Sequence, residues 1–187
     1  MSKQQEAPGE LETVRRFVNT VDIERGEEQL ESGPRLAAWL ADNGLAPSGL
    51  TAGAADLHRA LELREALRAV LLANNGSGPA PEAAWDALDA AARRARVELR
   101  FAAPAGPRLD AAAEGVDGAL GRLLEIVHGA VTDGTWTRMK ACRDHDCAWA
   151  FYDHSRNRSG AWCNMEVCGN RSKARAFRQR HPPAVSS

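Results

Sequence analysis

Apolar residues recur every three or four positions along most of this chain, which predicts a protein built mainly of α-helices. The pattern is clearest in five segments, at residues 11–21, 33–43, 52–73, 81–96 and 115–131. Residue types that begin or end helices flank them, since Ser32 precedes Pro34 and Asn74-Asn75-Gly76 follows a long apolar stripe. We therefore expect a helical domain over residues 11–134, preceded by a flexible tail at residues 1–10.

Two stretches within that domain depart from the helical period. Residues 97–101 alternate between apolar and polar, as a half-buried strand does, and the Pro104–Pro107 turn would return the strand through residue 112. Residues 22–33 are charged, and we expect a loop there. The predicted fold class of the domain is therefore mainly α, with one small β-hairpin.

All four cysteines lie in the last quarter of the chain, as Cys142-x4-Cys147 and Cys163-x4-Cys168. Four thiolates arranged as a tetrahedron suit Zn²⁺, with bonds of about 2.3 Å. Ordinary buried cysteines or two disulfides are the alternatives. Ordinary buried cysteines would be spread along the chain, whereas these four are clustered. Nothing in the sequence indicates the oxidising compartment that disulfides need. We expect one structural zinc ion, held by four protein ligands with no open position for chemistry.

The residues around the cysteines predict a small module at 135–181, followed by a tail at 182–187. Trp149 and Phe151 alternate as in a strand of a short hairpin and would form a miniature core, whereas Tyr152 is out of phase and expected at the surface. So small a module buries too little apolar area to fold alone, so the metal would supply the deficit.

A terminal helix is expected to follow the last cysteine, with Asn170 as its N-cap. Its inward-facing residues would be Ala174, Phe177 and His181. Cations in its first turn oppose the helix dipole, which indicates an anion nearby.

The net charge of −1 hides a division between the two parts of the chain. Residues 138–181 carry ten Lys/Arg and four Asp/Glu, a charge of +6, and the remaining fourteen basic and twenty-one acidic residues give −7. Such asymmetry is typical of a protein with one end that binds a polyanion. The candidate nucleic-acid contacts are Arg156, Arg158, Arg171, Lys173, Arg175 and Arg178.

The sequence lacks the common catalytic motifs: a nucleophile elbow, a phosphate-binding glycine loop and HExxH. We therefore expect no enzyme. No apolar run approaches the roughly 18 residues of a membrane span, so we expect a cytoplasmic protein without a membrane partner. Asn19 and Arg64 are candidates for a small-molecule pocket, although a buried structural ion pair is the alternative for Arg64.

Several strings of residues resemble known families. Those of the cysteine module are Arg138-Met139-Lys140-x-Cys142, Trp149-x-Phe151-Tyr152-Asp153, Ser155-Arg156-Asn157-Arg158 and Trp162-Cys163-x4-Cys168-Gly169-Asn170-Arg171-x-Lys173-x-Arg175. They resemble the CGNR zinc-finger family, named for the run at residues 168–171. Upstream, Phe17-Val18-Asn19-Thr20, the helix at 36–40 and Leu63-Arg64-Glu65-Ala66-Leu67-Arg68 resemble the ABATE domain, which usually precedes this finger in bacterial stress-induced transcription regulators.

The resemblance implies that Cys142, Cys147, Cys163 and Cys168 are zinc ligands. It also implies that Arg156, Arg158, Arg171, Lys173 and Arg175 contact DNA. Gly160-Ala161 is a departure, because relatives are commonly basic there. We expect a zinc-dependent DNA-binding transcription regulator whose acidic helical domain forms a homodimer or senses a small-molecule effector. An RNA-binding or protein-interaction zinc module and a thiol-based redox sensor are the alternatives.

Overall fold

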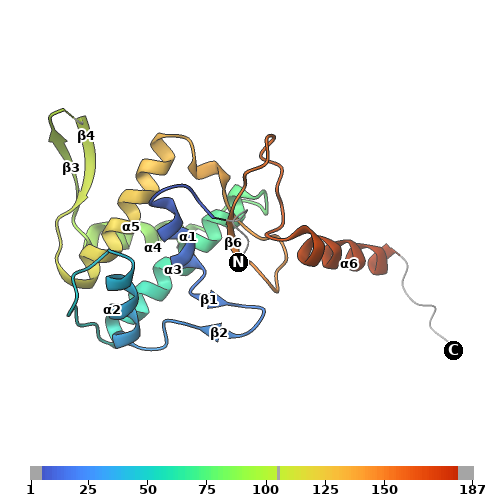
Figure 1. Cartoon of the computed structure of the whole chain (residues 1–187), viewed down its shortest axis with the longest axis horizontal. Helices are drawn as coiled ribbons and strands as arrows, with labels where there is room; N and C mark the ends of the chain where they lie inside the picture. Colours follow the sequence, from blue (N-terminus) through green and yellow to red (C-terminus); the bar gives the residue numbers. More distant parts are fainter. Residues whose placement is uncertain (1–5, 105, 181–187) are drawn as a thin grey trace.

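The computed structural model describes residues 6–104 and 106–180, and most of its regular structure is helical (Figure 1). The helices are α1 (Leu11–Val18), α2 (Gly33–Asp42), α3 (Ala54–Asn74), α4 (Glu82–Arg94), α5 (Gly115–Thr132), the 3₁₀ turn η2 (Trp136–Arg138), the π-helical turn η3 (Met165–Gly169) and α6 (Asn170–Arg180). Three antiparallel pairs of strands accompany them: β1 (Val21–Asp22) with β2 (Glu27–Glu28), β3 (Val97–Ala102) with β4 (Gly106–Ala111), and β5 (Met139–Ala141) with β6 (Ala150–Tyr152). The predicted mainly α fold is confirmed.

One hydrophobic core joins the helices to the cysteine region. At its centre Phe17, Leu67 and Leu123 from α1, α3 and α5 are fully buried. Met139 of β5 and Ala150 of β6 belong to the same core, because β5 packs on α3 and β6 on α1. The apolar core therefore continues past the end of α5 into the segment that carries the first two cysteines.

The boundaries expected at residues 11–134 and 135–181 stay predictions. At the start of the described chain Ala7 is buried, and its backbone N–H donates to Oε2 of Glu12 at 2.8 Å. Residues 1–5 and the expected tail at 182–187 lie outside the described residues.

The helix signals of the sequence are confirmed where they were strongest. Ser32 caps α2, its hydroxyl accepting from the N–H of Arg35 at 3.4 Å, and α3 ends at Asn74. The expected loop at 22–33 is wrong in part, because it contains the β1–β2 pair, whose strands of two residues are too short for a periodic pattern. Gly26 has φ +68° in the turn between them.

The β3–β4 hairpin pairs Val97 with Ala111 and Ala102 with Gly106, as the alternation predicted, and it extends away from the helices (Figure 1). Gly121 of α5 lies against its base. A Cβ at that glycine would come within 2.6 Å of the Cβ atoms of Ala111 and Ala95, so the helix can approach β4 only because the side chain is missing.

Two expectations for the cysteine region are wrong. Tyr152 is buried, because all three residues of β6 face the core or the helices that cover it. Asn170 is not the N-cap of the terminal helix, because α6 directly continues the π-helical turn η3. Its N-cap is Asn164, whose Oδ1 accepts from the N–H groups of Glu166 and Val167.

Helix α6 buries none of its side chains and projects from the body of the molecule (Figure 1). Ala174 and Phe177, expected to face inward, are exposed, and His181 lies outside the described residues. The prediction of an inward-facing side of the terminal helix is wrong for these two residues.

Candidate metal centre and basic surface

The sulfur atoms of Cys142, Cys147, Cys163 and Cys168 all lie within 4.8 Å of one another. Cys147 Sγ is 3.5 Å from Cys163 Sγ, which is 3.7 Å from Cys168 Sγ. A tetrahedron with Zn–S bonds of about 2.3 Å has edges of about 3.8 Å, so this arrangement fits one zinc ion. All four thiols are free, which rules out the disulfide alternative.

Local backbone structure brings three of the four cysteines to this point. Cys142 directly follows β5, and its N–H donates to the carbonyl of Trp149 at 2.9 Å. Cys147 lies in a turn closed by its own N–H, which donates to Asp144 O at 2.9 Å. Cys168 lies in η3, the turn capped by Asn164. The two pairs therefore come from a strand-turn and a helix-turn that face each other.

The crowding of the sulfurs opposes their joint ionisation. Hydrogen bonds from the thiols of Cys147 and Cys163 lower the pKa of Cys142 to about 2. The same hydrogen bond with Cys142 raises the pKa of Cys147 to about 12, and contact with both neighbours raises the pKa of Cys163. A divalent cation offsets this repulsion, and its binding would release the remaining thiol protons.

Around the sulfurs lies a shell of ion pairs that fixes the start of α6. The carboxylate of Asp144 is fully buried and contacts Nε of Arg171 at 2.5 Å and NH1 of Arg175 at 2.9 Å. Arg175 also contacts Asp146 at 2.5 Å. The turn that carries Cys147 is thereby joined to the helix that follows Cys168.

Arg171, the arginine of the CGNR run, has three acceptors. Besides Asp144 it donates to both carboxylate oxygens of Glu24, at 2.9 and 3.0 Å, and its NH2 lies 3.5 Å from Cys168 Sγ. The hydrogen bond to Glu24 raises the pKa of Arg171, and Arg171 lowers the pKa of Glu24. Because the helix begins at Met165, Arg171 is not in its first turn. The anion inferred from the helix dipole is therefore unnecessary, since carboxylates of the chain itself compensate this charge.

The six predicted nucleic-acid contacts thus fall into two groups. Arg171 and Arg175 are held by carboxylates. The others are exposed, and within residues 6–104 and 106–180 they have no acidic partner: Arg156, Arg158, Lys173 and Arg178.

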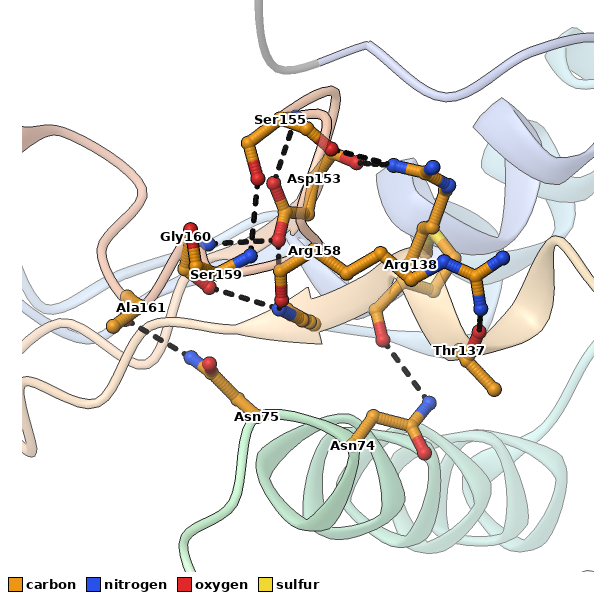
Figure 2. A network of polar contacts seen from close by, with 12 residues as sticks. Asn74, Asn75, Thr137, Arg138, Asp153, Ser155, Arg158, Ser159, Gly160 and Ala161 are labelled. Atoms are coloured by element: carbon orange, nitrogen blue, oxygen red, sulfur yellow. Dashed lines mark hydrogen bonds and ion pairs between the residues drawn. The ribbon is translucent and has the colours of Figure 1, made fainter.

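A buried ion pair supports the loop that carries Arg156 and Arg158. Lys140 Nζ lies 2.7 Å from Oδ2 of Asp153 and donates to the carbonyls of Arg158 and Gly160 at 2.6 and 3.0 Å. Asp153 also accepts from the N–H groups of Ser155 and Gly160 (Figure 2). Burial alone would raise the pKa of Asp153, but these hydrogen bonds outweigh it and lower the pKa to about 2.

Gly160 has a steric role in this network. A Cβ there would lie 2.8–3.0 Å from three atoms of the Asp153 carboxylate. This close approach explains why a glycine stands where the resemblance leads one to expect a basic residue.

Polar side chains of the helical domain clamp the backbone of the cysteine region, a feature that sequence reasoning missed. Asn19 donates to the carbonyl of Ala150 at 2.8 Å and accepts from its N–H at 2.7 Å, as a strand neighbour would. Arg68 donates to Ala148 O at 2.9 Å, and Asn75 donates to Ala161 O at 2.9 Å. Asn75 had signalled only a helix end in the sequence. Its hydrogen bond to Ala161 joins residues 86 positions apart, so no local sequence pattern predicts it.

The two candidates for a ligand pocket are both engaged by protein groups. Asn19 belongs to the clamp, and Arg64 is buried with its NH1 2.8 Å from both carboxylate oxygens of Glu28 and its Nε 2.8 Å from Glu65. These contacts favour the buried ion pair over a ligand role for Arg64.

The fold and the sulfur cluster together define a small four-cysteine zinc finger built onto a helical domain. Comparison with known families agrees. Residues 12–146 match the ABATE family, described as "Putative stress-induced transcription regulator", and residues 138–181 match the CGNR zinc finger. The chain therefore belongs to the ABATE family and carries a C-terminal CGNR zinc finger, whose four cysteines hold one zinc ion. No curated protein matches the chain.

The family description is that of a transcription regulator. None of the helices in the described part of the chain is long and apolar enough to cross a membrane.

Proposed function

We propose that this protein is a zinc-dependent DNA-binding transcription regulator whose finger contacts the phosphate backbone. The observation that carries the proposal is the set of exposed cations on the finger that lack acidic partners within the described residues. They lie on the loop at 154–160 and on α6, which projects into solvent. Uncompensated Arg and Lys side chains on one module of an otherwise acidic protein are typical of a phosphate-binding surface.

The six contact residues predicted from the sequence are not equally available for phosphate. Arg156, Arg158, Lys173 and Arg178 are available as they stand. Arg171 and Arg175 would have to exchange their carboxylates for phosphates.

The acidic helical domain would supply dimerisation or ligand sensing. A cavity of about 560 Å³ between the start of α1, the end of α2 and α5 supports the sensing role, since ligand sites are commonly 300–1,000 Å³. Asn43 lines it, and its Oδ1 is buried without a hydrogen-bond partner among the described residues. A small molecule that donates a hydrogen bond there would complete the site.

A thiol-based redox sensor is the second candidate, because Cys163 is less buried than the other three ligands. In that case peroxide would oxidise two thiolates to a disulfide, itself being reduced to water, and zinc would leave. Retention of zinc and of DNA binding under peroxide would contradict it.

The test is fluorescence anisotropy of a labelled duplex with the zinc-loaded protein, at salt concentrations from about 50 to 200 mM. We expect log affinity to fall linearly with log salt, with a slope near −0.9 for each phosphate neutralised. Absence of binding at the lowest salt would contradict the proposal. Competition with structured RNA separates the DNA role from an RNA-binding module. Genome-wide mapping of bound sites would reveal dimer symmetry as a palindrome.

A further inference from the structure

Two arginine side chains of the finger connect residues 137–138 with the loop that follows β6. NH1 of Arg138 donates to the carbonyls of Asp153 and Ser155, both at 2.9 Å. NH1 of Arg158 donates to the hydroxyl of Thr137 at 3.2 Å, on the residue next to Arg138 (Figure 2). Ser155 O also accepts from the N–H of Arg158 at 3.2 Å, so both arginines meet residues 137–138 and the start of the loop.

Neither guanidinium faces a carboxylate within residues 6–104 and 106–180. Their acceptors are neutral oxygens, and the acid of this loop, Asp153, is buried and already paired with Lys140. Arg138 is half-buried, whereas Arg158 and the nearby Arg156 are exposed. All three cations belong to this loop or to the residue that it contacts, and guanidinium groups bind phosphate oxygens particularly well.

The loop is held in shape before any ligand arrives. The N–H of Ser159 donates to the hydroxyl of Ser155 at 3.0 Å. The buried ammonium of Lys140 donates to the carbonyls of Arg158 and Gly160. A binding loop that is already ordered loses less conformational entropy on binding than a mobile one.

The CGNR arginine is in the opposite situation. The guanidinium of Arg171 contacts Asp144, Glu24 and the sulfur of Cys168. The guanidinium of Arg175 forms ion pairs with Asp144 and Asp146. These residues surround a metal ligand and join it to the helix, which is how outer-sphere groups support a zinc site.

We propose that the phosphate-binding site of the finger consists of Arg138, Arg156 and Arg158, and that Arg171 serves the metal centre instead. The ligand is a phosphate group, which duplex DNA or a free phosphate can supply. The assignment of that phosphate to duplex DNA rests on the proposed function. Lys140 and Asp153 are positioning residues for this site.

The experiment compares single variants of the full zinc-loaded chain: Arg138→Gln, Arg156→Gln and Arg158→Gln in the loop, Lys173→Gln and Arg178→Gln on α6, and Arg171→Gln at the metal. Arg100→Gln on the distant β3 strand is the charge-matched control. Each variant is first checked for zinc content and circular dichroism. Arg156→Gln is the most informative, because its side chain makes no hydrogen bond within the described residues that folding would lose.

We expect each loop variant to reduce the magnitude of the salt slope by about 1. Each should also weaken binding to duplexes of different sequence by about the same factor, because phosphate contacts do not depend on the base sequence. Arg100→Gln should leave the slope unchanged. Arg171→Gln should lower zinc affinity by about 10- to 100-fold, measured by competition with a chromophoric chelator, with its slope preserved when zinc is saturating. Unaltered slopes in all three loop variants would overturn the inference. Reduced slopes in Lys173→Gln and Arg178→Gln would then assign the phosphate contacts to α6.

Inorganic phosphate separates failure of the site from failure of the proposed function. We expect a phosphate titration to shift the side-chain N–H resonances of the loop arginines in NMR spectra, and Arg156→Gln to weaken the effect. If phosphate shifts these resonances but duplex DNA does not bind, the loop site stands and the DNA-binding role fails. If duplex DNA binds and the loop resonances stay unchanged, the site is wrong and the DNA-binding role stands.

Discussion

The ion pair between Lys140 and Asp153 shows how a single buried charge can determine the shape of a surface loop. Both side chains are almost completely buried, at 6% and 3% exposure, and each makes further hydrogen bonds to loop backbone groups. Removing one partner of such a pair leaves the other charge buried and unpaired, which typically costs 3–5 kcal/mol. The resemblance string Arg138-Met139-Lys140 therefore contains a structural lysine beside a surface arginine.

The lowered pKa of Asp153 predicts a specific pH dependence. Its pKa falls from 3.8 to about 2 on folding, so the folded carboxylate binds protons more weakly than the unfolded one. This contribution, on the order of 2 kcal/mol, is complete above the unfolded pKa and is lost as pH falls from about 4 through 2. Urea unfolding of wild type and Asp153→Asn should give a stability difference that is constant from neutral pH to about 4.5 and shrinks below it. A difference that grows towards low pH would contradict the assignment.

Gly160→Ala tests the close approach at the same carboxylate. The added Cβ would meet Asp153 at 2.8–3.0 Å, so we expect a loss of about 1–3 kcal/mol in the free energy of unfolding. Gly129→Ala is the matched control, because nothing lies within 4 Å of the Cβ it would gain in α5. Alanine there should stabilise the helix by up to about 1 kcal/mol. Equal effects at the two positions, measured by urea unfolding, would argue against the described loop geometry.

At the scale of elements, the clamp between the helices and the β5–β6 pair connects the two family regions. Asn19 at the end of α1 and Arg68 of α3 hold backbone groups that the short strands leave unpaired. Both residues belong to the strings by which the helical domain resembles its family. The physical role we infer for these strings is to hold the finger in place.

Asn19→Ala should loosen this attachment. It leaves the buried N–H of Ala150 without a partner among the described residues, whereas the carbonyl keeps a longer contact with NH1 of Arg15 at 3.5 Å. One unpaired buried donor should cost about 1–3 kcal/mol in the free energy of unfolding. Amide hydrogen exchange at Ala150 should accelerate. Asn157→Ala, at an exposed loop position, is the control and should change stability by less than about 0.5 kcal/mol. Unchanged exchange at Ala150 would contradict the clamp.

The elements that the sequence predicted are those whose signals are local. A helix such as α2 carries its own apolar period and its own N-cap, and the cysteine spacing indicated the metal directly. The β1–β2 pair has no such signal, because two residues per strand cannot display alternation. Tyr152 was misplaced because β6 is covered on both faces, and alternation identifies only strands with one exposed face.

The parts of the site that sequence reasoning missed are long-range pairs. Asn19 meets Ala150 across 131 positions, and Arg171 meets Glu24 across 147. An arginine beside a zinc ligand has the same local pattern whether it faces phosphate or carboxylate. Only the fold, which brings Asp144 and Glu24 to it, separates the two roles.

At the scale of the whole molecule, the helical domain and the first part of the finger share one hydrophobic core. The two family matches overlap at residues 138–146. This overlap contains β5, which packs in the core, and Cys142, the first of the four cysteines. Beyond it, residues 161–180 bury few apolar side chains and depend on the sulfurs and on Asp144. The finger is therefore fixed to the core at one end and held by metal at the other.

Metal content and its removal test the central claim, that one zinc ion on four thiolates holds the finger together. Purified protein should contain one zinc per chain by elemental analysis. Hydrogen exchange during chelation should then show loss of protection across residues 161–180, with the amides of β5 and β6 less affected because the helices still clamp them. A chain that lacks stoichiometric metal, or one whose residues 161–180 stay protected after chelation, would contradict the account.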